Sequence, residues 1–491
     1  MKSFAIIVLS LLLGPLAAHA AGQPPNILHI LADDMGWTAL SCYGNKDVAT
    51  PNLDRLAAQG MRFTAAYADA QCSPTRAAFF SGQYGARSGV FKVIHEQEPP
   101  KAFMRIPTPN LSMSSDVATL ATTLRRAGYT TGLSGKWHIA NNYSAAALRG
   151  IEGGKYFDRY GFDFCGEASQ SAHAEDKAVT AITDGILGFI EHSKGRPWFA
   201  CAMHFTTHAK LSAPKALVEK HAARGYRRTT SPVAKFAERP TAEYLAMLEH
   251  FDNEIGRLLA RLDGWGLRDN TLVVFTSDNG GLSRMASCAP LREGKGSPYE
   301  GGIRVPLILR WPAKIKPGSV TDTPVHTVDF YPTFAALAGA TPPAGHQLDG
   351  ASLVPLLTGG GPPARAALYW HMPSYTPMYG RTPCAVIRQG DWKLIHWFGD
   401  YLDPRGFTPD DAPYGKLVVG PRAELYNLRD DLSETRDLAA TQPGKARELR
   451  AALDQWFVDT GAGFPTENPD FDEATWWATK ESAPKRKSKD K

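Results

Sequence analysis

The sequence predicts an α/β protein with a large, mostly parallel sheet flanked by helices, followed by a smaller C-terminal α+β domain with a short antiparallel sheet. Over the first two-thirds of the 491 residues, short apolar runs alternate with amphipathic segments, the pattern of a sheet covered on both faces. Gly (45) and Pro (36) are frequent, which is typical of many loops and not of a helical bundle. After the Pro/Gly-rich stretch 358–363, short strand-like runs follow one another closely, which indicates an antiparallel sheet.

The predicted elements follow in order along the chain. Residues 26–32 (NILHILA) form an apolar run that ends abruptly at two aspartates, as expected for a buried strand. Further strands of the larger domain are predicted at 130–133, 198–204 and 272–276, and helices at 53–60, 120–128, 177–192 and 244–262. In the smaller domain we predict strands at 367–371, 384–388 and 392–397 and a closing helix at 446–458.

The first twenty residues resemble a secretory signal peptide. Lys2 is followed by the apolar run 4–13 and by Ala-His-Ala at 18–20, a small-residue cleavage pattern. The run is too short to span a bilayer, which takes about 20 apolar residues, and no later stretch approaches that length. We therefore expect an exported protein, periplasmic or secreted, without stable membrane insertion. The expected domains are a signal peptide (1–20), an α/β domain (21–360), an α+β subdomain (361–475) and a basic disordered tail (476–491).

Composition and charge exclude several classes of protein. Apolar residues make up 43% and charged residues 21% of the chain, which argues against disorder and against a multi-span membrane protein. The formal net charge is +5, of which +4 lies in the last twelve residues and +1 at Lys2. The neutral remainder lacks the basic face that nucleic-acid binding requires, so we expect no nucleic-acid partner.

The six cysteines are scattered and form no C-x-x-C pair, so no zinc site is expected. They are Cys42, Cys72, Cys165, Cys201, Cys288 and Cys384. An even number in an exported protein permits disulfides, although a chain of this length can bury a core without them.

Residues 72–82 (CSPTRAAFFSG) predict a short helix. Ser73 is the expected N-cap, Pro74 suits the first helical position and Gly82 suits the stop. Cys72 would then lie just ahead of a helix N-terminus, where free N–H groups favour an anion. Arg76, one turn into the helix, offers a fork for a tetrahedral oxyanion. The alternative is an ordinary helix start with a buried cysteine.

Acidic residues end two of the predicted strands. Asp33 and Asp34 are adjacent carboxylates, which repel one another unless a cation lies between them. Asp278 and Asn279 follow the strand at 272–276. Ligands of open α/β sheets bind at the carboxyl ends of the strands, and four oxygen donors without His or Cys suit Ca²⁺ or Mg²⁺. The alternative is that each pair caps a helix or turn.

Cationic and imidazole side chains occur in three further loops. Lys136 and His138 in GKWH lie two residues apart, so in an extended stretch both point the same way. His208 follows the strand at 198–204, and Lys295 lies in a Gly-flanked loop. Such side chains are often merely solvated. His204, inside an apolar run, is expected to be a core histidine with its hydrogen bonds satisfied.

These segments, in this order, resemble the type I sulfatases of the alkaline-phosphatase superfamily. The matching stretches are NILHILADDMG, TPNLDRLAAQG, CSPTRAA, SGKWH, SDNGG, EGGIRVP and the late DWKLI and ELYNL. The combination of C-x-P-[ST]-R with GKWH is highly specific, and the resemblance covers residues 26–438. It implies a sulfuric ester hydrolase that acts on a sulfated saccharide or a small sulfate ester.

The resemblance implies two cofactors. A formylglycine-generating maturation enzyme would convert Cys72 to Cα-formylglycine, whose hydrate is the nucleophile. One divalent cation, typically Ca²⁺ and alternatively Mg²⁺, would be held by Asp33, Asp34, Asp278 and Asn279 together with position 72. Cys72 would then join no disulfide.

The resemblance also implies roles for the cationic and imidazole side chains. Arg76 and Lys136 would orient and polarise the hydrate, and His138 would contact its second hydroxyl. His208 and Lys295 would hold the sulfate oxygens and the leaving oxygen. A serine could form the covalent sulfate but has no second hydroxyl through which to expel it, so the advantage of the aldehyde lies in turnover.

Two alternatives remain open at this point. A phosphonate monoester or phosphodiester hydrolase would use the same formylglycine chemistry. A non-catalytic protein that binds sulfated glycans would use an inactive scaffold, although every expected catalytic position here carries the needed residue type. Segments 92–115, 210–240 and 369–388 are expected to rim the pocket. The candidate substrate contacts are Tyr299, His371, Tyr379, Arg381 and Arg388.

Overall fold

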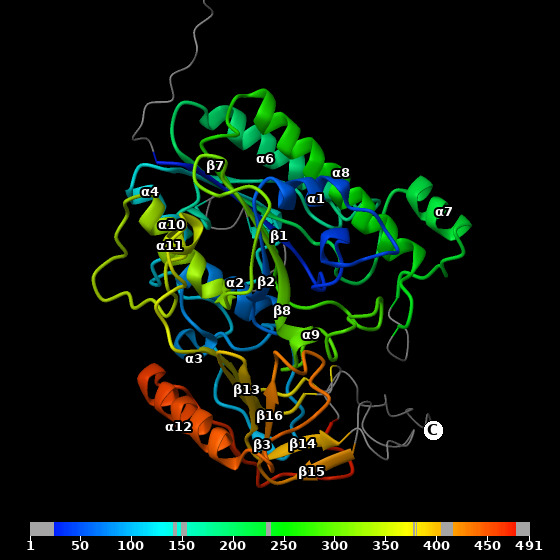
Figure 1. Ribbon diagram of the computed structural model, residues 1–491, viewed down its shortest axis with the longest axis vertical. Coiled ribbons are helices and arrows are strands. Elements are labelled where there is room, and N and C mark those ends of the chain that lie inside the picture. The colour runs from blue at the N-terminus through cyan, green and yellow to red at the C-terminus, as the bar shows by residue number, and fades with distance from the viewer. Residues whose placement is uncertain are drawn as a thin grey trace, which may run out of the picture.

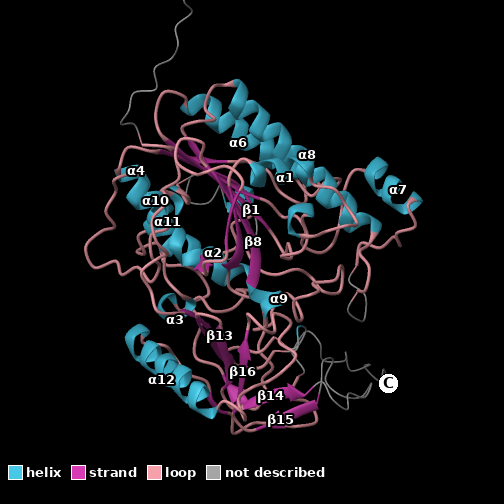
Figure 2. Cartoon of the chain, viewed as in Figure 1, coloured by secondary structure: helices cyan, strands magenta, loops and turns pink. Residues whose placement is uncertain are grey.

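The computed structural model describes residues 24–140, 145–148, 155–231, 237–376, 379, 381–403 and 416–477. A large sheet with helices on both faces lies next to a smaller antiparallel sheet covered by one long helix (Figure 1). Figure 2 shows the same view by type of secondary structure. The predicted fold class is confirmed. The predicted signal peptide and residues 478–491 of the predicted tail lie outside the described residues.

The larger sheet has nine strands within these ranges, in the order β10-β2-β8-β7-β1-β6-β4-β5, with β9 also paired to β2. Their bounds are β1 Asn26–Ala32, β2 Met61–Tyr67, β4 Thr130–Gly135, β5 Phe164–Cys165, β6 Trp198–Met203, β7 Thr271–Ser277, β8 Arg304–Arg310, β9 Ser319–Thr321 and β10 Val325–His326. Only β8 runs against its neighbours, β2 and β7. The sheet is therefore mostly parallel.

The central strands are aligned so that their carboxyl ends meet at one edge. In β1, Leu31 pairs with Met203 of β6 and Ala32 pairs with Ser277 of β7. Met203 also pairs with Gly135, the last residue of β4. The loops that follow β7, β1, β6 and β4 consequently leave the sheet side by side.

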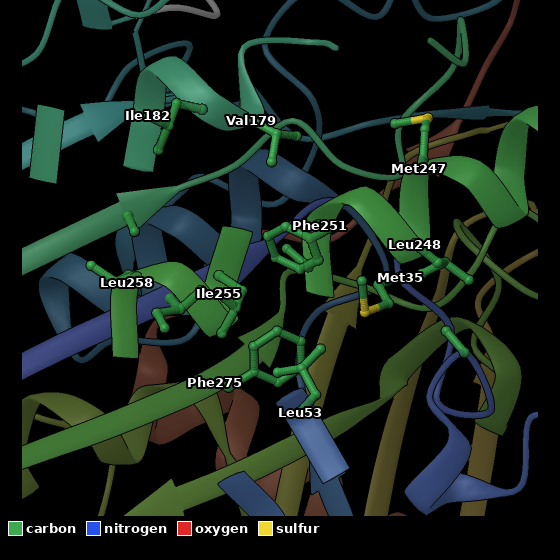
Figure 3. Close-up of a cluster of buried hydrophobic side chains, with 14 of the residues drawn as sticks. Met35, Leu53, Val179, Ile182, Met247, Leu248, Phe251, Ile255, Leu258 and Phe275 are labelled. Atoms are coloured by element: carbon green, nitrogen blue, oxygen red, sulfur yellow. The ribbon is translucent and has the colours of Figure 1, made fainter. Parts of the chain in front are cut away.

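Two hydrophobic cores lie on opposite faces of the sheet. In β1, Ile27 and Leu31 face one core while Leu28 and Ile30 face the other, as the alternation of side chains along a strand requires. The first core contains helices α2 (Cys72–Ser81), α4 (Leu120–Arg126) and α10 (Phe330–Leu337). The second contains α1 (Pro51–Ala58), α6 (Val179–Ser193) and α8 (Ala242–Gly264). Figure 3 shows this second core, where Phe251 of α8 lies near Phe275 of β7.

The smaller sheet has the order β11-β12-β13-β16 and is antiparallel throughout. Its strands are β11 Leu368–Met372, β12 Cys384–Gln389, β13 Trp392–Trp397 and β16 Arg422–Asn427, and helix α12 (Pro443–Thr460) packs on it. Two small two-stranded sheets accompany it, β14 Asp400–Asp403 with β15 Lys416–Val419, and β3 Met104–Arg105 with β17 Thr466–Glu467. Trp476, placed in the tail by the sequence prediction, is buried and packs near Tyr375. The packed structure therefore continues past residue 475, where the α+β subdomain was expected to end.

Each predicted helix and strand is present, with ends shifted by a few residues. The central strands β2 and β8 were not among the predicted elements. β8 contains Pro306 in its middle, and proline argues against a central strand. The remaining helices are α3 Gly85–Ser88, α5 Ala145–Leu148, α7 Lys215–Ala223, α9 Glu300–Ile303 and α11 Val354–Leu357, with short 3-10 turns η1 Ser41–Tyr43, η3 Asp158–Tyr160 and η4 Thr327–Asp329.

The structure bears on two further expectations. Each of the six cysteines is described and none forms a disulfide, so the prediction that Cys72 joins none is confirmed. Of the helices in the described ranges, none is both long and apolar enough to span a bilayer.

Candidate active site

The predicted acidic residues come together where the central strands end. Asp33 and Asp34 follow β1 and Asp278 follows β7, while Cys72 begins α2 after β2. Oxygen atoms of the three carboxylates and the Cys72 Sγ all lie within 4.8 Å of one another. All four residues are buried. Residues 245 positions apart thus form one cluster, because parallel strands deliver their carboxyl ends to the same edge of the sheet.

Each of the three carboxylates forms a buried ion pair with one cation. The pairs are Asp33–Lys136 at 2.7 Å, Asp34–Lys295 at 2.7 Å and Asp278–Arg76 at 2.8 Å. Three negative and three positive charges balance. A divalent cation added to this cluster would make it positive, which suits an anionic substrate.

The pKa values of the carboxyl groups reflect this arrangement. Burial alone would raise the pKa of Asp33, but the charges of Lys136 and His208 hold it well below its usual range. The pKa of Asp34 is also lowered, chiefly by Lys295 against the effect of burial. Burial and the charge of Asp33 raise the pKa of Asp278 to about 6. The three carboxyl groups therefore differ in pKa although they are adjacent, because each faces a different set of charges.

Helix α2 begins two residues earlier than predicted, at Cys72 and not at Pro74. Its N-cap is Gln71, and Cys72 is the first residue of the helix. Ser73 is therefore not the cap, and its buried Oγ has no hydrogen-bond partner in the described chain. The Cys72 thiol donates to Asp33 Oδ1 at 3.4 Å and accepts from Lys295 Nζ at 3.4 Å. The side chain at position 72 thus lies between a carboxylate and a cation, where the oxygens of a formylglycine would be.

The Cys72 thiol is not set up for thiolate chemistry. Burial and the charge of Asp278 raise its pKa well above the usual range, against the effect of Lys136 and Lys295. Reactive cysteines show the opposite shift. The cysteine as encoded is therefore a poor nucleophile in this environment.

The donor set fits a hard divalent cation. Asp34 Oδ2 and Asn279 Oδ1 are buried and have no hydrogen-bond partner among the described residues. Asn279 Nδ2 donates to Asp34 Oδ1 at 2.9 Å, which fixes the amide beside the carboxylates. Oxygen donors that are buried without a partner are costly unless a ligand satisfies them, and carboxylate and amide oxygens are what Ca²⁺ and Mg²⁺ prefer.

Lys136 and His138 both reach the site, but not by the extended geometry that we predicted. Gly135 and His138 have left-handed backbone conformations, with φ of 106° and 57°. Both side chains are buried. Burial and the charges of Lys136 and Arg76 lower the pKa of His138 well below its usual range, so its imidazole is neutral and can accept a proton.

His208 is the most accessible of the predicted site residues. Its side chain is 30% exposed, and its Nε2 lies 3.8 Å from Asp34 Oδ2. Burial and the charge of Lys295 lower its pKa to about 4. Lys177, which the sequence analysis did not single out, donates to the backbone carbonyls of His208 and Lys210 and so fixes this loop.

His204 is a core residue, as predicted. It is fully buried and its ring packs edge-on against Phe251 at 4.8 Å. Its hydrogen bonds are not satisfied, however, since neither ring nitrogen has a partner within the described ranges. Burial lowers its pKa to about 3.

The loop that carries Lys295 is tied to the smaller domain. The backbone N–H of Lys295 donates to Gly281 O at 2.9 Å. Glu300, the first residue of α9, pairs with Lys393 of β13 at 3.0 Å, and Lys393 also pairs with Glu434 at 2.7 Å. The three charged side chains are fully buried. The smaller domain therefore helps to hold the site loop in place.

Three candidate substrate contacts are wrong, because their side chains are buried in other interactions. Tyr299 donates to Glu424 at 2.8 Å, the imidazole of His371 hydrogen-bonds the Gly463 carbonyl at 2.8 Å, and Arg388 contacts Tyr67. The other two candidates lie beside the site. A Cβ placed on Gly296 would lie 2.4 Å from the ring of Tyr379, and Arg381 donates to Gln71 at 3.3 Å.

The sequence-based prediction missed several residues that surround the site. Besides Lys177, it overlooked Thr207, whose hydroxyl donates to Asp34 O at 3.0 Å, and the pair Gln71–Glu96, whose side chains are hydrogen-bonded at 3.0 Å. None of them belongs to a motif. Two signals were available in the sequence: Gln71 directly precedes Cys72, and Glu96 lies in segment 92–115, which was expected to rim the pocket.

Family models and known proteins match most of this chain. A family model described as Sulfatase matches residues 25–340, and one described as N-sulphoglucosamine sulphohydrolase, C-terminal, matches residues 295–404. A "Sulfatase" of Formosa agariphila is 32% identical over 94% of this chain and 95% of its own length. Human "Arylsulfatase A" is 32% identical over 91% of this chain and 89% of its own length.

Solved structures share the fold over almost the whole chain. The crystal structure of Ps i-CgsB in complex with k-i-k-neocarrahexaose superposes with a TM-score of 0.68 and 25% identity. The match covers 94% of this chain and 96% of that one. The clustered strand-end carboxylates, the cysteine between them and these matches lead to one conclusion: the chain belongs to the sulfatase family, a family of sulfuric ester hydrolases.

Proposed function

We propose that this sulfatase desulfates carbohydrates through a formylglycine made from Cys72, with aryl sulfates as surrogate substrates. The observation that carries the proposal is the environment of Cys72. Its Sγ contacts a carboxylate and a lysine at the centre of the acidic cluster, yet the thiol itself is held neutral. A position placed to act as nucleophile with an unreactive thiol calls for conversion of that thiol.

A bound Ca²⁺ or Mg²⁺ would be held by Asp33, Asp34, Asp278 and Asn279. Oxygens of the three carboxylates lie within 4.8 Å of Cys72 Sγ, and the amide of Asn279 is hydrogen-bonded to Asp34. When bound, the cation stabilises negative charge on oxygen, and the aldehyde hydrate supplies a nucleophilic hydroxyl and a second one for release of sulfate.

The chain's own cations offset the repulsion between two anions. Arg76 is held rigidly, since it donates twice to Asp278 and once to the backbone carbonyl of Lys136 at 3.1 Å. Lys136 and Lys295 are buried; Lys295 Nζ lies 3.4 Å from Cys72 Sγ, and Lys136 pairs with Asp33, which Cys72 also contacts. Fixed positive charge in a site from which water is largely excluded is the main way in which enzymes stabilise anionic transition states.

Two histidines and a lysine would handle protons and the leaving group. The neutral His138 is suited to accept a proton from the hydroxyl at position 72. Lys295, whose charge is maintained by Asp34, would donate a hydrogen bond to the leaving oxygen. His208 would hold the sulfate oxygens from the accessible side of the site.

A carbohydrate substrate and an exported location are parts of the same proposal. They are supported by the predicted signal peptide and by Ps i-CgsB, which has been solved with k-i-k-neocarrahexaose. Export to the periplasm or out of the cell would bring the enzyme to sulfated polysaccharides and their fragments. A formylglycine-generating enzyme is the partner that maturation requires.

Peptide mass spectrometry and a substrate comparison test the proposal together. The peptide that contains position 72, from protein produced with a maturation system, should show the mass of formylglycine in place of cysteine. The same preparation should release sulfate from 4-nitrophenyl sulfate faster than it cleaves bis(4-nitrophenyl) phosphate. Sulfated oligosaccharides such as carrageenan, ulvan, fucoidan and glycosaminoglycan fragments should also be desulfated.

Three results would contradict the proposal, each in a different part. An unmodified and inactive Cys72 would favour a binding protein. Faster phosphodiester cleavage would favour the phosphodiesterase alternative. Activity on small aryl esters alone would remove the carbohydrate assignment.

A further inference from the structure

Glu96 is a carboxylate that lies beside the site without taking part in its ion pairs. It belongs to the loop between α3 and β3, and both of its carboxylate oxygens accept hydrogen bonds from Gln71 Nε2 at 3.0 Å. Gln71 directly precedes Cys72 in the chain. Glu96 therefore contacts the residue that directly precedes the proposed nucleophile.

Across the ranges that the structure describes, no cation pairs with the Glu96 carboxylate. Lys92 pairs with the carboxylate of Glu98 and donates to the backbone carbonyl of Glu96 at 2.6 Å. Arg381 donates to Gln71 rather than to Glu96. Burial raises the pKa of Glu96, and Gln71, Arg381 and Lys92 act in the opposite direction. A carboxylate has about four lone-pair sites, so Glu96 can accept a further hydrogen bond.

Glu96 is partly exposed, and two neighbouring side chains mark where it lies. His95 is exposed, and its ring stacks on that of the buried His138 with centroids 6.1 Å apart. Tyr379 lies against Gly296 in the loop of the site lysine, and the charge of Glu96 acts on its phenol. Glu96 thus belongs to the layer of side chains between the buried cluster and the solvent, which a bound substrate would meet.

We propose that Glu96 is a specificity-determining residue that selects esters with a hydrogen-bond donor, and not a second anion, beside the sulfate. This inference rests on the proposed sulfatase function. It names the substrate class as saccharides whose position next to the sulfate ester carries a free hydroxyl or amine. A second sulfate or a carboxylate there would meet the unpaired charge of Glu96. Two like charges in a partly buried site disfavour binding by about tenfold or more.

A pair of aryl sulfates that differ in one charge tests the inference. Sulfate release is measured at pH 8 for 3-carbamoylphenyl sulfate and 3-carboxyphenyl sulfate, and kcat/KM for the neutral ester is divided by that for the anionic ester. We expect the ratio to fall about fivefold or more in Glu96→Gln relative to the unsubstituted enzyme. The difference in leaving-group reactivity is the same for both enzymes and cancels. The fraction of active enzyme cancels too.

Glu98→Gln is the matched control, because Glu98 lies in the same loop and its charge is already paired with Lys92. Its substrate ratio should equal that of the unsubstituted enzyme. An unchanged ratio in Glu96→Gln, or an equal change in Glu98→Gln, overturns the inference and leaves the sulfatase assignment intact. Failure of the formylglycine-bearing protein to release sulfate from either ester overturns the assignment and the inference together.

Discussion

Asn279 shows how much a single side chain reveals about the ligand of this site. Its Nδ2 makes two hydrogen bonds at 2.9 Å, to Asp34 Oδ1 and Gly280 O, while its buried Oδ1 has no partner among the described residues. The nitrogen of the amide thus fixes Asn279 beside the acidic cluster, and the oxygen is left for a ligand. Unlike Asp278, it does so without also serving an ion pair, so its removal affects metal binding with few side effects.

Replacing Asn279 should weaken the metal site without changing its charge. In Asn279→Ala we expect the affinity for Ca²⁺ to fall on the order of tenfold, because one oxygen ligand is lost. The rise in Tm on addition of Ca²⁺ should shrink accordingly, and sulfatase activity should need more Ca²⁺. Thermal denaturation over a Ca²⁺ titration measures this.

Ser73→Ala provides the control for Asn279→Ala. Ser73 is adjacent to Cys72 and buried, and its Oγ has no hydrogen-bond partner within the described chain. Its Ca²⁺ dependence should match that of the unsubstituted protein. Equal Ca²⁺ dependence in Asn279→Ala would show that the amide is not a ligand.

At the scale of elements, the site depends on how strands end and loops begin. β4 ends at Gly135, where the chain turns so that the backbone N–H of Lys136 donates to Met203 O at 2.7 Å. A Cβ at Gly135 would lie 2.0 Å from that carbonyl oxygen, and its φ is 106°. Only glycine fits this turn. This turn places Lys136 beside Asp33.

Gly135→Ala should therefore lower both stability and activity. Gly128, just before the same strand, has a φ of 89° but no atom within 4 Å of an added Cβ. Gly128→Ala should cost about 1 kcal/mol through backbone conformation alone and leave kcat unchanged. Gly135→Ala adds a steric clash to that cost and should lose most of its activity. Equal effects of the two substitutions on urea denaturation and kcat would contradict this account.

At the scale of the whole molecule, buried charge joins the part that contains the larger sheet to the smaller sheet. Lys393 of the smaller sheet lies between the carboxylates of Glu300 and Glu434, and all three are fully buried. Tyr67 of β2 also donates to Glu300 at 2.7 Å. Because α9 directly follows the loop of Lys295, the interface between the domains also supports the site.

Lys393→Met should destabilise the protein by about 3–5 kcal/mol, because it leaves two buried carboxylates without their shared cation. Lys445→Met is the control, since Lys445 forms an exposed i,i+3 pair with Glu448 on α12. Its effect should be within about 0.5 kcal/mol. Urea denaturation of both variants measures the difference in their free energies of unfolding. An equally small effect of Lys393→Met would contradict a stabilising role of the buried charges.

Stability should also fall in mild acid. Burial lowers the pKa of five histidines, to about 3 for His29, His204 and His326 and to about 4 for His371 and His396. Below pH 6.5 these residues take up protons in the unfolded chain but not in the folded one. Each therefore lowers stability by about 1.4 kcal/mol per pH unit until its folded-state pKa is reached.

Tm measured between pH 7 and 4 checks this prediction. His29→Phe should flatten the pH dependence, because His29 stacks on Phe79 with ring centroids 4.1 Å apart and phenylalanine can keep that contact without titrating. His192→Phe, at an exposed position of α6, should leave the pH dependence unchanged. A stability that does not fall between pH 6.5 and 4 would refute the argument.

The sequence by itself determined the fold class, most of the elements and the residues at the centre of the site. Asp33, Asp34 and Asp278 could be identified because each ends an apolar run, and the ends of parallel strands meet at one edge. Cys72 and Arg76 lie in a short motif with specific spacing. These signals are local, so they can be recognised from the sequence alone.

Tertiary structure decided what no local pattern encodes. It alone set which cation pairs with which carboxylate. It also placed Glu96 beside Gln71, and Lys393 beside Glu300 after the loop of Lys295. It also buried Tyr299, which sequence reasoning had placed at the substrate. Such contacts join residues far apart in the chain. They depend on how two domains and several loops pack together, whereas a local motif depends only on neighbouring residues.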